Sequence, residues 1–199
     1  PQLRAGDTFV FTGGRVRQVS KIEGDRVTWR NRKRDLFVSS RDFFTPRLLQ
    51  RKRAEVVSRF FDFPRKPQSL WPLSVGKSVQ FVVNTRIQPN DMDAYRLNIR
   101  YWRCEVRSKD LTETPAGAFD TYRIRCRSYA RPDQMDLAWF YRIETTYDYA
   151  PEINHFVRRT FRSRKGGTRF KTALEAYLPA RRATRVRIDD AVARARDPS

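Results

Sequence analysis

Two runs of the sequence carry arginine at the spacing expected for one surface of a β-strand. In the first run, Arg123, Arg125 and Arg127 occupy alternate positions, so their side chains would share one face. The second run holds five basic residues between residues 158 and 165. Guanidinium groups donate paired hydrogen bonds to phosphates and carboxylates, so both runs predict contact with an anionic partner. The candidate anion-binding residues are Arg123, Arg125, Arg127, Arg158, Arg159, Arg162, Arg164 and Lys165.

Aromatic residues such as Tyr122, Tyr141 and Phe161 are interleaved with these arginines. Proteins that bind single-stranded nucleic acid combine a basic surface with aromatic rings on which bases stack. An antiparallel sheet with one solvated face also alternates aromatic core residues with exposed charges. The pattern therefore fits both a nucleic-acid surface and the ordinary solvent face of a β-sheet.

The two cysteines, Cys104 and Cys126, are placed symmetrically about Pro115, which begins the turn sequence Pro-Ala-Gly. In a hairpin with a three-residue loop centred there, the cysteines would face each other across the strands. Directly opposed antiparallel residues have Cα atoms about 4.5–5.5 Å apart, which a disulfide can bridge. We therefore expect a Cys104–Cys126 disulfide and an oxidising compartment. The alternative is two buried thiols in a cytosolic protein.

No residue pattern indicates catalysis. His155 is the single histidine, which excludes a site with several histidine ligands, and its spacing from the two cysteines is not that of a zinc site. The sequence contains no nucleophile elbow, glycine-rich phosphate loop or HExxH motif. We therefore expect a protein that is not an enzyme and that has no metal and no cofactor.

The composition excludes several classes of protein. The chain has 199 residues, with 42 Lys+Arg against 22 Asp+Glu, and its formal net charge is +20. A hydrophobic content of 39% with 13% aromatics is too high for a disordered basic tail, and the short apolar runs predict no membrane span. Residues 1–70 hold 17 basic and 7 acidic residues, and residues 71–199 hold 25 and 15. This even division argues against a single basic arm for nucleic acid.

Short strands separated by tight turns dominate residues 1–62. We expect strands near residues 7–11, 15–22, 26–31 and 36–39, which predicts a small SH3-like barrel or a meander. For residues 46–70 the sequence allows either one apolar helical face or a strand at residues 55–61. Pro64 and Pro67 mark an expected linker at residues 63–70.

Longer strands follow in residues 71–180, for which we expect a larger curved antiparallel β-sheet. Tyr95, Leu97, Ile99 and Tyr101 alternate with polar residues, which predicts an apolar face and an Arg-rich face. Residues 181–199 form a basic tail, either helical or disordered. The protein is therefore expected to be mainly β, and whether its two modules share one core stays open.

Two resemblances can be recognised. The segment GDTFVF at residues 6–11, followed by a Gly-Gly pair and a basic strand, resembles the KOW motif of SH3-like barrels, which implies RNA binding. Most of the chain resembles exported proteins and lipoproteins of unknown function from alphaproteobacteria. This second resemblance is carried by WPL at residues 71–73 with Gly76, PAGAFDT at residues 115–121, and YAPE at residues 149–152. It implies a curved antiparallel sheet and an envelope location.

The sequence thus predicts a non-enzymatic binding or assembly protein of the cell envelope, periplasmic or associated with the outer membrane. Its Arg-rich surface would contact an anionic partner such as another envelope protein, peptidoglycan or lipid head groups. A signal peptide or lipid anchor upstream of Pro1 is part of this expectation. The alternative is a cytosolic protein that binds RNA or single-stranded DNA.

Overall fold

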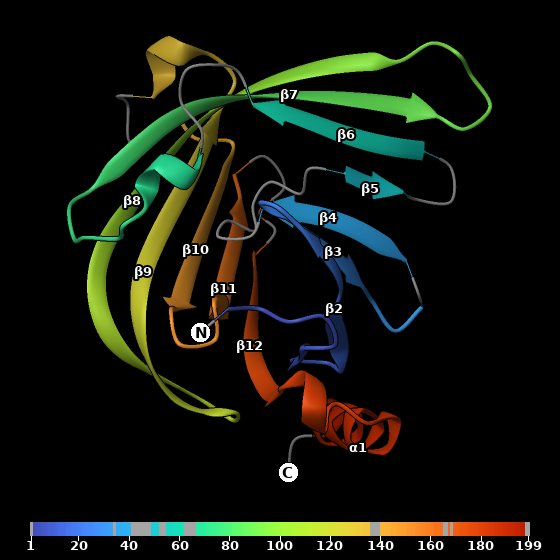
Figure 1. Cartoon of the computed structure of the whole chain (residues 1–199). Helices are drawn as coiled ribbons and strands as arrows, with labels where there is room; N and C mark the ends of the chain where they lie inside the picture. Colours follow the sequence, from blue (N-terminus) through green and yellow to red (C-terminus); the bar gives the residue numbers. More distant parts are fainter. Residues whose placement is uncertain are drawn as a thin grey trace.

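One large antiparallel sheet makes up most of the protein (Figure 1). The computed structural model describes residues 2–33, 35–40, 49–51, 55–61, 67–135, 140–164, 167 and 169–197. Within these residues the strands are β1 (Thr8–Phe11), β2 (Arg15–Glu23), β3 (Arg26–Arg30), β4 (Leu36–Ser40), β5 (Leu49–Arg51), β6 (Glu55–Phe61), β7 (Ser78–Pro89), β8 (Arg96–Thr114), β9 (Gly117–Tyr129), β10 (Ile143–Ala150), β11 (His155–Ser163) and β12 (Arg169–Leu178). The expected mainly β class is confirmed.

Each described strand pairs with the strands before and after it in the chain, and β1 pairs with both β2 and β12. The sheet therefore curls round until its two ends meet. The pairing between neighbouring strands is shortest at β5, because β5 is only three residues long. Phe37 and Val38 of β4 are its register partners on one side.

The concave side of the sheet holds one main apolar core. Its buried side chains come from the N-terminal strands, such as Phe9 and Trp29, and from the long strands, such as Ile124 and Phe156. The expected separation into modules of residues 1–62 and 71–180 is therefore not visible in the packing. Strands β1 to β4 form a meander, which is one of the two expected alternatives. They are part of the large sheet, because β1 is hydrogen-bonded to β12.

The segment expected to be a linker at residues 63–70 contributes to this core. Residues 62–66 lie outside the described part of the chain. Pro67–Leu70 form the 3-10 helix η1, in which Leu70 is completely buried. The strand alternative for residues 55–61 is confirmed, because β6 covers that range.

The C-terminal tail is helical where it is described. Ala180–Arg182 form the 3-10 helix η3, and Arg185–Arg196 form the helix α1, which packs on the outer side of β1 and β2 through Val192 and Ala195. Gly14 adopts a positive φ of 69°, and an added Cβ would lie 3.0 Å from the Val192 side chain. Glycine at this turn therefore lets the helix approach the sheet closely.

The hairpin of β8 and β9 carries the two cysteines. Its loop has two residues, because Thr114 pairs with Gly117, and a bulge lies between Val106 and Ser108. A two-residue loop alone would set the cysteines one residue out of register, and the bulge restores their pairing. Cys104 and Cys126 are therefore directly opposed, and they form a buried disulfide.

Along β8 the apolar residues change from one face to the other. In the second half of the strand, Trp102, Cys104 and Val106 are buried on the concave side. In the first half the apolar residues occupy the opposite, convex face. The register with β7 is unbroken from Arg96 to Glu105, so no bulge causes this change. The first half of β8 extends with β6 and β7 as an arm beyond the rest of the sheet (Figure 1).

Candidate functional site

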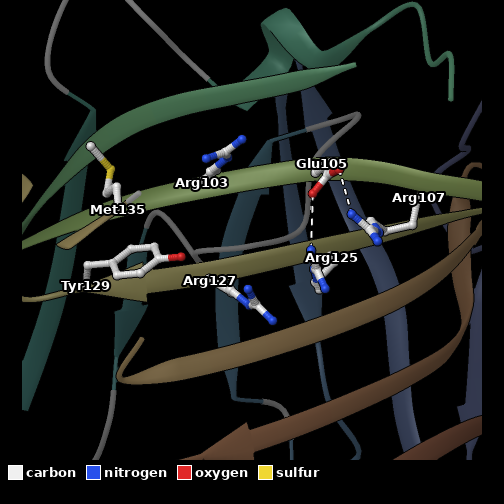
Figure 2. A pocket seen from close by; sticks show the side chains of 7 residues that line it. All are labelled: Arg103, Glu105, Arg107, Arg125, Arg127, Tyr129 and Met135. Carbon is white, nitrogen blue, oxygen red and sulfur yellow. Dashed lines mark hydrogen bonds and ion pairs between the residues drawn. The ribbon is translucent and has the colours of Figure 1, made fainter. Parts of the chain in front are cut away.

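An arginine-rich hollow of about 230 Å³ lies on the convex face of β8 and β9. Side chains from alternate positions of the two strands line it, since alternate residues of a strand share one face. Figure 2 shows two of these arginines, Arg107 and Arg125, in contact with the carboxylate of Glu105. We call this site the arginine pocket. Its lining residues are Arg103, Glu105, Arg107, Arg125, Arg127, Tyr129 and Met135.

Glu105 is held by two of these arginines. One carboxylate oxygen accepts from Arg107 at 2.8 Å, and the other accepts from Arg125 at 3.3 Å. These dashed contacts in Figure 2 fix the two guanidinium groups beside the pocket. The four arginines of the lining outnumber its one carboxylate, so the pocket has an excess of positive charge.

Arg127 connects the pocket to the next strand. Its Nε donates to Glu144 of β10 at 2.6 Å, and its guanidinium lies 5.1 Å from the centroid of the Tyr141 ring. Arg103 is the register partner of Arg127 on β8. Two arginines therefore face each other directly across the strands, which places two cations at one end of the pocket.

The surroundings shift the pKa values of two lining residues, Glu105 and Tyr129. Burial alone raises the pKa of Glu105, but the hydrogen bonds and charges of Arg107 and Arg125 outweigh it and hold the pKa below its ordinary value of 4.5. Burial raises the pKa of Tyr129, so its phenol stays protonated at neutral pH. A general acid needs a proton and a pKa near the working pH, which an ionised Glu105 does not supply.

Two of the predicted arginines contact a buried carboxylate outside the pocket. Asp148 of β10 is almost completely buried and accepts from Arg123 Nε at 2.9 Å. Arg158 approaches it to 3.9 Å and donates to the Glu113 carbonyl at 2.7 Å. The hydrogen bond to Asp148 raises the pKa of Arg123 further. These two arginines therefore hold strands together.

The rest of the basic run at residues 158–165 is divided between the two faces. Consecutive residues of a strand point to opposite sides, so Arg159 faces the concave side. Its guanidinium lies 5.4 Å from the Phe170 ring centroid. Arg162 and Arg164 border a second hollow of about 270 Å³ on the convex face. Lys165 lies outside the described residues. The eight predicted residues therefore do not form one patch.

The arginine spacing in the sequence indicated Arg125 and Arg127 but not the part of the pocket that comes from β8. The signal was present, because the register that pairs the two cysteines also pairs Arg103 with Arg127 and Glu105 with Arg125. Met135 gave no such signal. It follows the short 3-10 helix η2 (Pro132–Gln134), whose position over the sheet the strand pattern does not specify.

Two other features are absent from the described residues. No group of three or more His, Cys, Asp and Glu residues within the described ranges could hold a metal ion. None of the helices in that part of the chain is long and apolar enough to cross a membrane.

The fold and the pocket define a curled antiparallel β-protein with a basic convex face. The chain matches no protein family and no curated protein sequence. Among solved structures it is similar to the hypothetical lipoprotein YmcC of Escherichia coli K12, with a TM-score of 0.53 and 9% identity over 90% of this chain and 91% of that one. A candidate exported protein with a YmcC-like fold from Bacteroides fragilis is similar over 88% of this chain and 97% of its own, with a TM-score of 0.45 and 14% identity.

The similarity to YmcC shows that this chain has the fold of a protein described as a lipoprotein. That agrees with the fold implied by the resemblance to exported proteins. The alphaproteobacterial origin and the three turn motifs stay predictions. The SH3-like barrel implied by the KOW resemblance does not form as a separate unit, since β1 completes the large sheet.

Proposed function

We propose that the protein is a non-enzymatic binding protein of the cell envelope that holds an anionic group of its partner in the arginine pocket. The observation that carries the proposal is the convergence of four arginines from two neighbouring strands on one hollow. Planar guanidinium groups fixed on a rigid sheet can bind phosphate or carboxylate oxygens in pairs. Another envelope protein, peptidoglycan and lipid head groups all present such anions.

Two observations support the envelope location. The buried Cys104–Cys126 disulfide is typical of proteins that fold in an oxidising compartment. The fold is also that of the lipoprotein YmcC. Expression of the full gene followed by cell fractionation tests the location. Recovery in the periplasm or with membranes, with Cys104 and Cys126 resistant to a thiol-alkylating reagent, is the expected result. Cytosolic protein with two free thiols would contradict it.

A titration with inorganic phosphate in dilute buffer tests the pocket, with the shifts of the arginine Nε resonances followed by NMR. We expect the double variant Arg103→Gln/Arg127→Gln to bind phosphate roughly tenfold more weakly or worse, because it loses two charged donors. The matched control is Arg15→Gln/Arg26→Gln, which makes the same change in net charge at exposed positions of β2 and β3. Equal loss in both variants would contradict a specific pocket.

The nucleic-acid alternative can be tested by measuring oligonucleotide binding at several salt concentrations. For a single-stranded RNA that binds through its phosphates, the logarithm of the affinity falls with the logarithm of salt by roughly 0.7 per neutralised phosphate. We expect only weak binding of a single-stranded oligonucleotide. Tight binding with a steep salt dependence would favour the RNA or single-stranded DNA hypothesis instead.

A further inference from the structure

The arm formed by β6 and the adjoining halves of β7 and β8 has an apolar convex face that the protein leaves exposed. Asn84 of β7 pairs with Phe60 on one side and with Ile99 on the other, so these three residues share a face. Tyr95 and Leu97 continue that face along the chain. The four apolar side chains, which we call the arm face, are Phe60 at 58% exposure, Tyr95 at 54%, Leu97 at 59% and Ile99 at 43%.

Along β8, the apolar and polar faces in the arm are exchanged relative to the body of the sheet. In the body of the sheet, the concave side is apolar and the convex side is charged. On β8 within the arm, the concave-side positions Arg96 and Asn98 are polar and the apolar Leu97 and Ile99 lie on the convex side. On β6 and β7 the concave side stays apolar, because Val57 and Ile87 share that face with Arg96. The core of the protein cannot cover the apolar residues on the convex side. A cluster of exposed apolar side chains is typical of a surface that binds another protein or a membrane.

Arginines adjoin the arm face on β7 and further along β8. The Arg86 guanidinium lies 4.0 Å from the centroid of the Tyr95 ring, and Arg86 pairs with Leu97. On the same face of β8, six residues after Leu97, Arg103 begins the arginine pocket. Leu97 and Arg103 are therefore about 20 Å apart along the strand at the usual rise per residue. An apolar surface and a cationic surface thus follow one another along one face of β8.

We propose that the convex face of β7–β9 docks on an anionic lipid surface, with the arm face at the acyl boundary and the arginine pocket on headgroup phosphates. This proposal rests on the proposed function and names its partner. A small number of inserted apolar side chains, combined with basic groups, is sufficient for peripheral binding to anionic lipid. Asp91 and Asp93 flank Met92 in the β7–β8 turn, so the strand face rather than the tip of the hairpin meets the lipid.

A second copy of the chain fits this face less well. Four half-exposed side chains supply on the order of 400 Å², about half of what a standard interface buries on each partner. Two copies that each carry a formal charge of +20 would also repel each other. An anionic membrane has the complementary charge and needs no fixed area of contact.

Flotation of the full chain with lipid vesicles tests the proposal. We expect binding to vesicles of phosphatidylcholine with phosphatidylglycerol and little binding to phosphatidylcholine alone. The variant Leu97→Asn/Ile99→Asn should bind roughly tenfold more weakly, because two apolar side chains leave the acyl boundary. Leu111→Asn is the matched control, since Leu111 is 65% exposed on the same strand beyond the pocket, and it should bind like the unaltered protein.

Three results would overturn the proposal. They are undiminished vesicle binding by Leu97→Asn/Ile99→Asn, absence of vesicle binding by the unaltered protein, and a dimer in light scattering that this variant dissociates. Thermal unfolding of each variant checks that the exposed substitutions leave the fold intact. The phosphate titration is independent of these results. If Arg103→Gln/Arg127→Gln weakens phosphate binding while vesicle binding is absent, the pocket stands and the lipid proposal fails.

Discussion

Ile99 and Arg103 lie on the same face of β8, four residues apart, and belong to surfaces of opposite character. Ile99 is an exposed apolar residue of the arm face, while Arg103 lines the arginine pocket. Between them the apolar residues of β8 move from the convex to the concave side without a bulge. One regular strand therefore presents an apolar and a cationic surface on the same side of the sheet.

The first prediction concerns the charge balance of the pocket. Glu105→Gln should bind inorganic phosphate roughly three- to tenfold more tightly, because it removes a negative charge and releases Arg107 and Arg125 for the ligand. Glu113→Gln changes the charge equally on the same strand and is the control. Calorimetric titration of both variants provides the comparison. If Glu105→Gln bound phosphate no better than Glu113→Gln did, the pocket would not be the anion site.

The second prediction concerns the buried carboxylate of Asp148. Asp148→Asn should lower the free energy of unfolding by about 1–3 kcal/mol, because it breaks the charged hydrogen bond from Arg123 and the contact with Arg158. The partly exposed arginines can turn to water, which limits the loss. Urea unfolding measures it, with Asp120→Asn as an exposed control. Phosphate binding should persist, and a loss of stability no larger than in the control would argue against this strand-bridging role.

A third prediction concerns the disulfide. It closes a loop between residues 22 positions apart, so its reduction should cost about 3 kcal/mol of stability through the entropy gained by the unfolded chain. Urea unfolding with and without reductant measures this difference. The variant Cys104→Ala/Cys126→Ala should show no response to reductant. A response in that variant would mean that the reductant acts elsewhere.

The fourth prediction follows from His155, which is fully buried and stacks on Phe9 with ring centroids 4.4 Å apart. Burial, helped by the charge of Arg17, lowers the pKa of His155 from 6.5 to about 3. As pH falls below 6.5, the unfolded chain takes up a proton that the folded protein does not. Stability is therefore complete above pH 6.5 and declines toward pH 3, by about 1.4 kcal/mol per pH unit from this group.

His155→Phe keeps the apolar packing and removes the titration. Unfolding free energies from pH 7.5 to pH 5 should therefore show a smaller slope for this variant than for the unaltered protein. The comparison of slopes does not depend on the absolute stability of the variant. Parallel curves would show that His155 is not the titrating group.

The strands themselves could be predicted from the sequence because period-2 alternation and turn residues are local signals. The expected strands near residues 15–22 and 26–31 correspond to β2 and β3. The cysteine pairing could also be predicted, although the loop has two residues and not three. The bulge between Val106 and Ser108 compensates for that difference, and a bulge has no clear sequence signal.

The sequence could not show which element covers which face. Tyr95, Leu97 and Ile99 alternate like core residues, but the arm carries them past the body of the sheet and they are exposed. The predicted division into modules depended on local turn signals, whereas the contact of β1 with β12 joins residues far apart in the chain. Ion pairs such as Arg127–Glu144 likewise depend on the register between strands.

Contact between the arm face and lipid can be measured most directly with a fluorescent residue placed on it. Tyr95→Trp puts an indole on the arm face, and Leu111→Trp puts one on the same strand beyond the pocket. Fluorescence is recorded with anionic vesicles whose acyl chains carry bromine, and the signal of the unaltered protein is subtracted. We expect a blue shift and strong quenching at position 95 and neither at position 111. Equal quenching at both positions, or none at position 95, would contradict the lipid proposal.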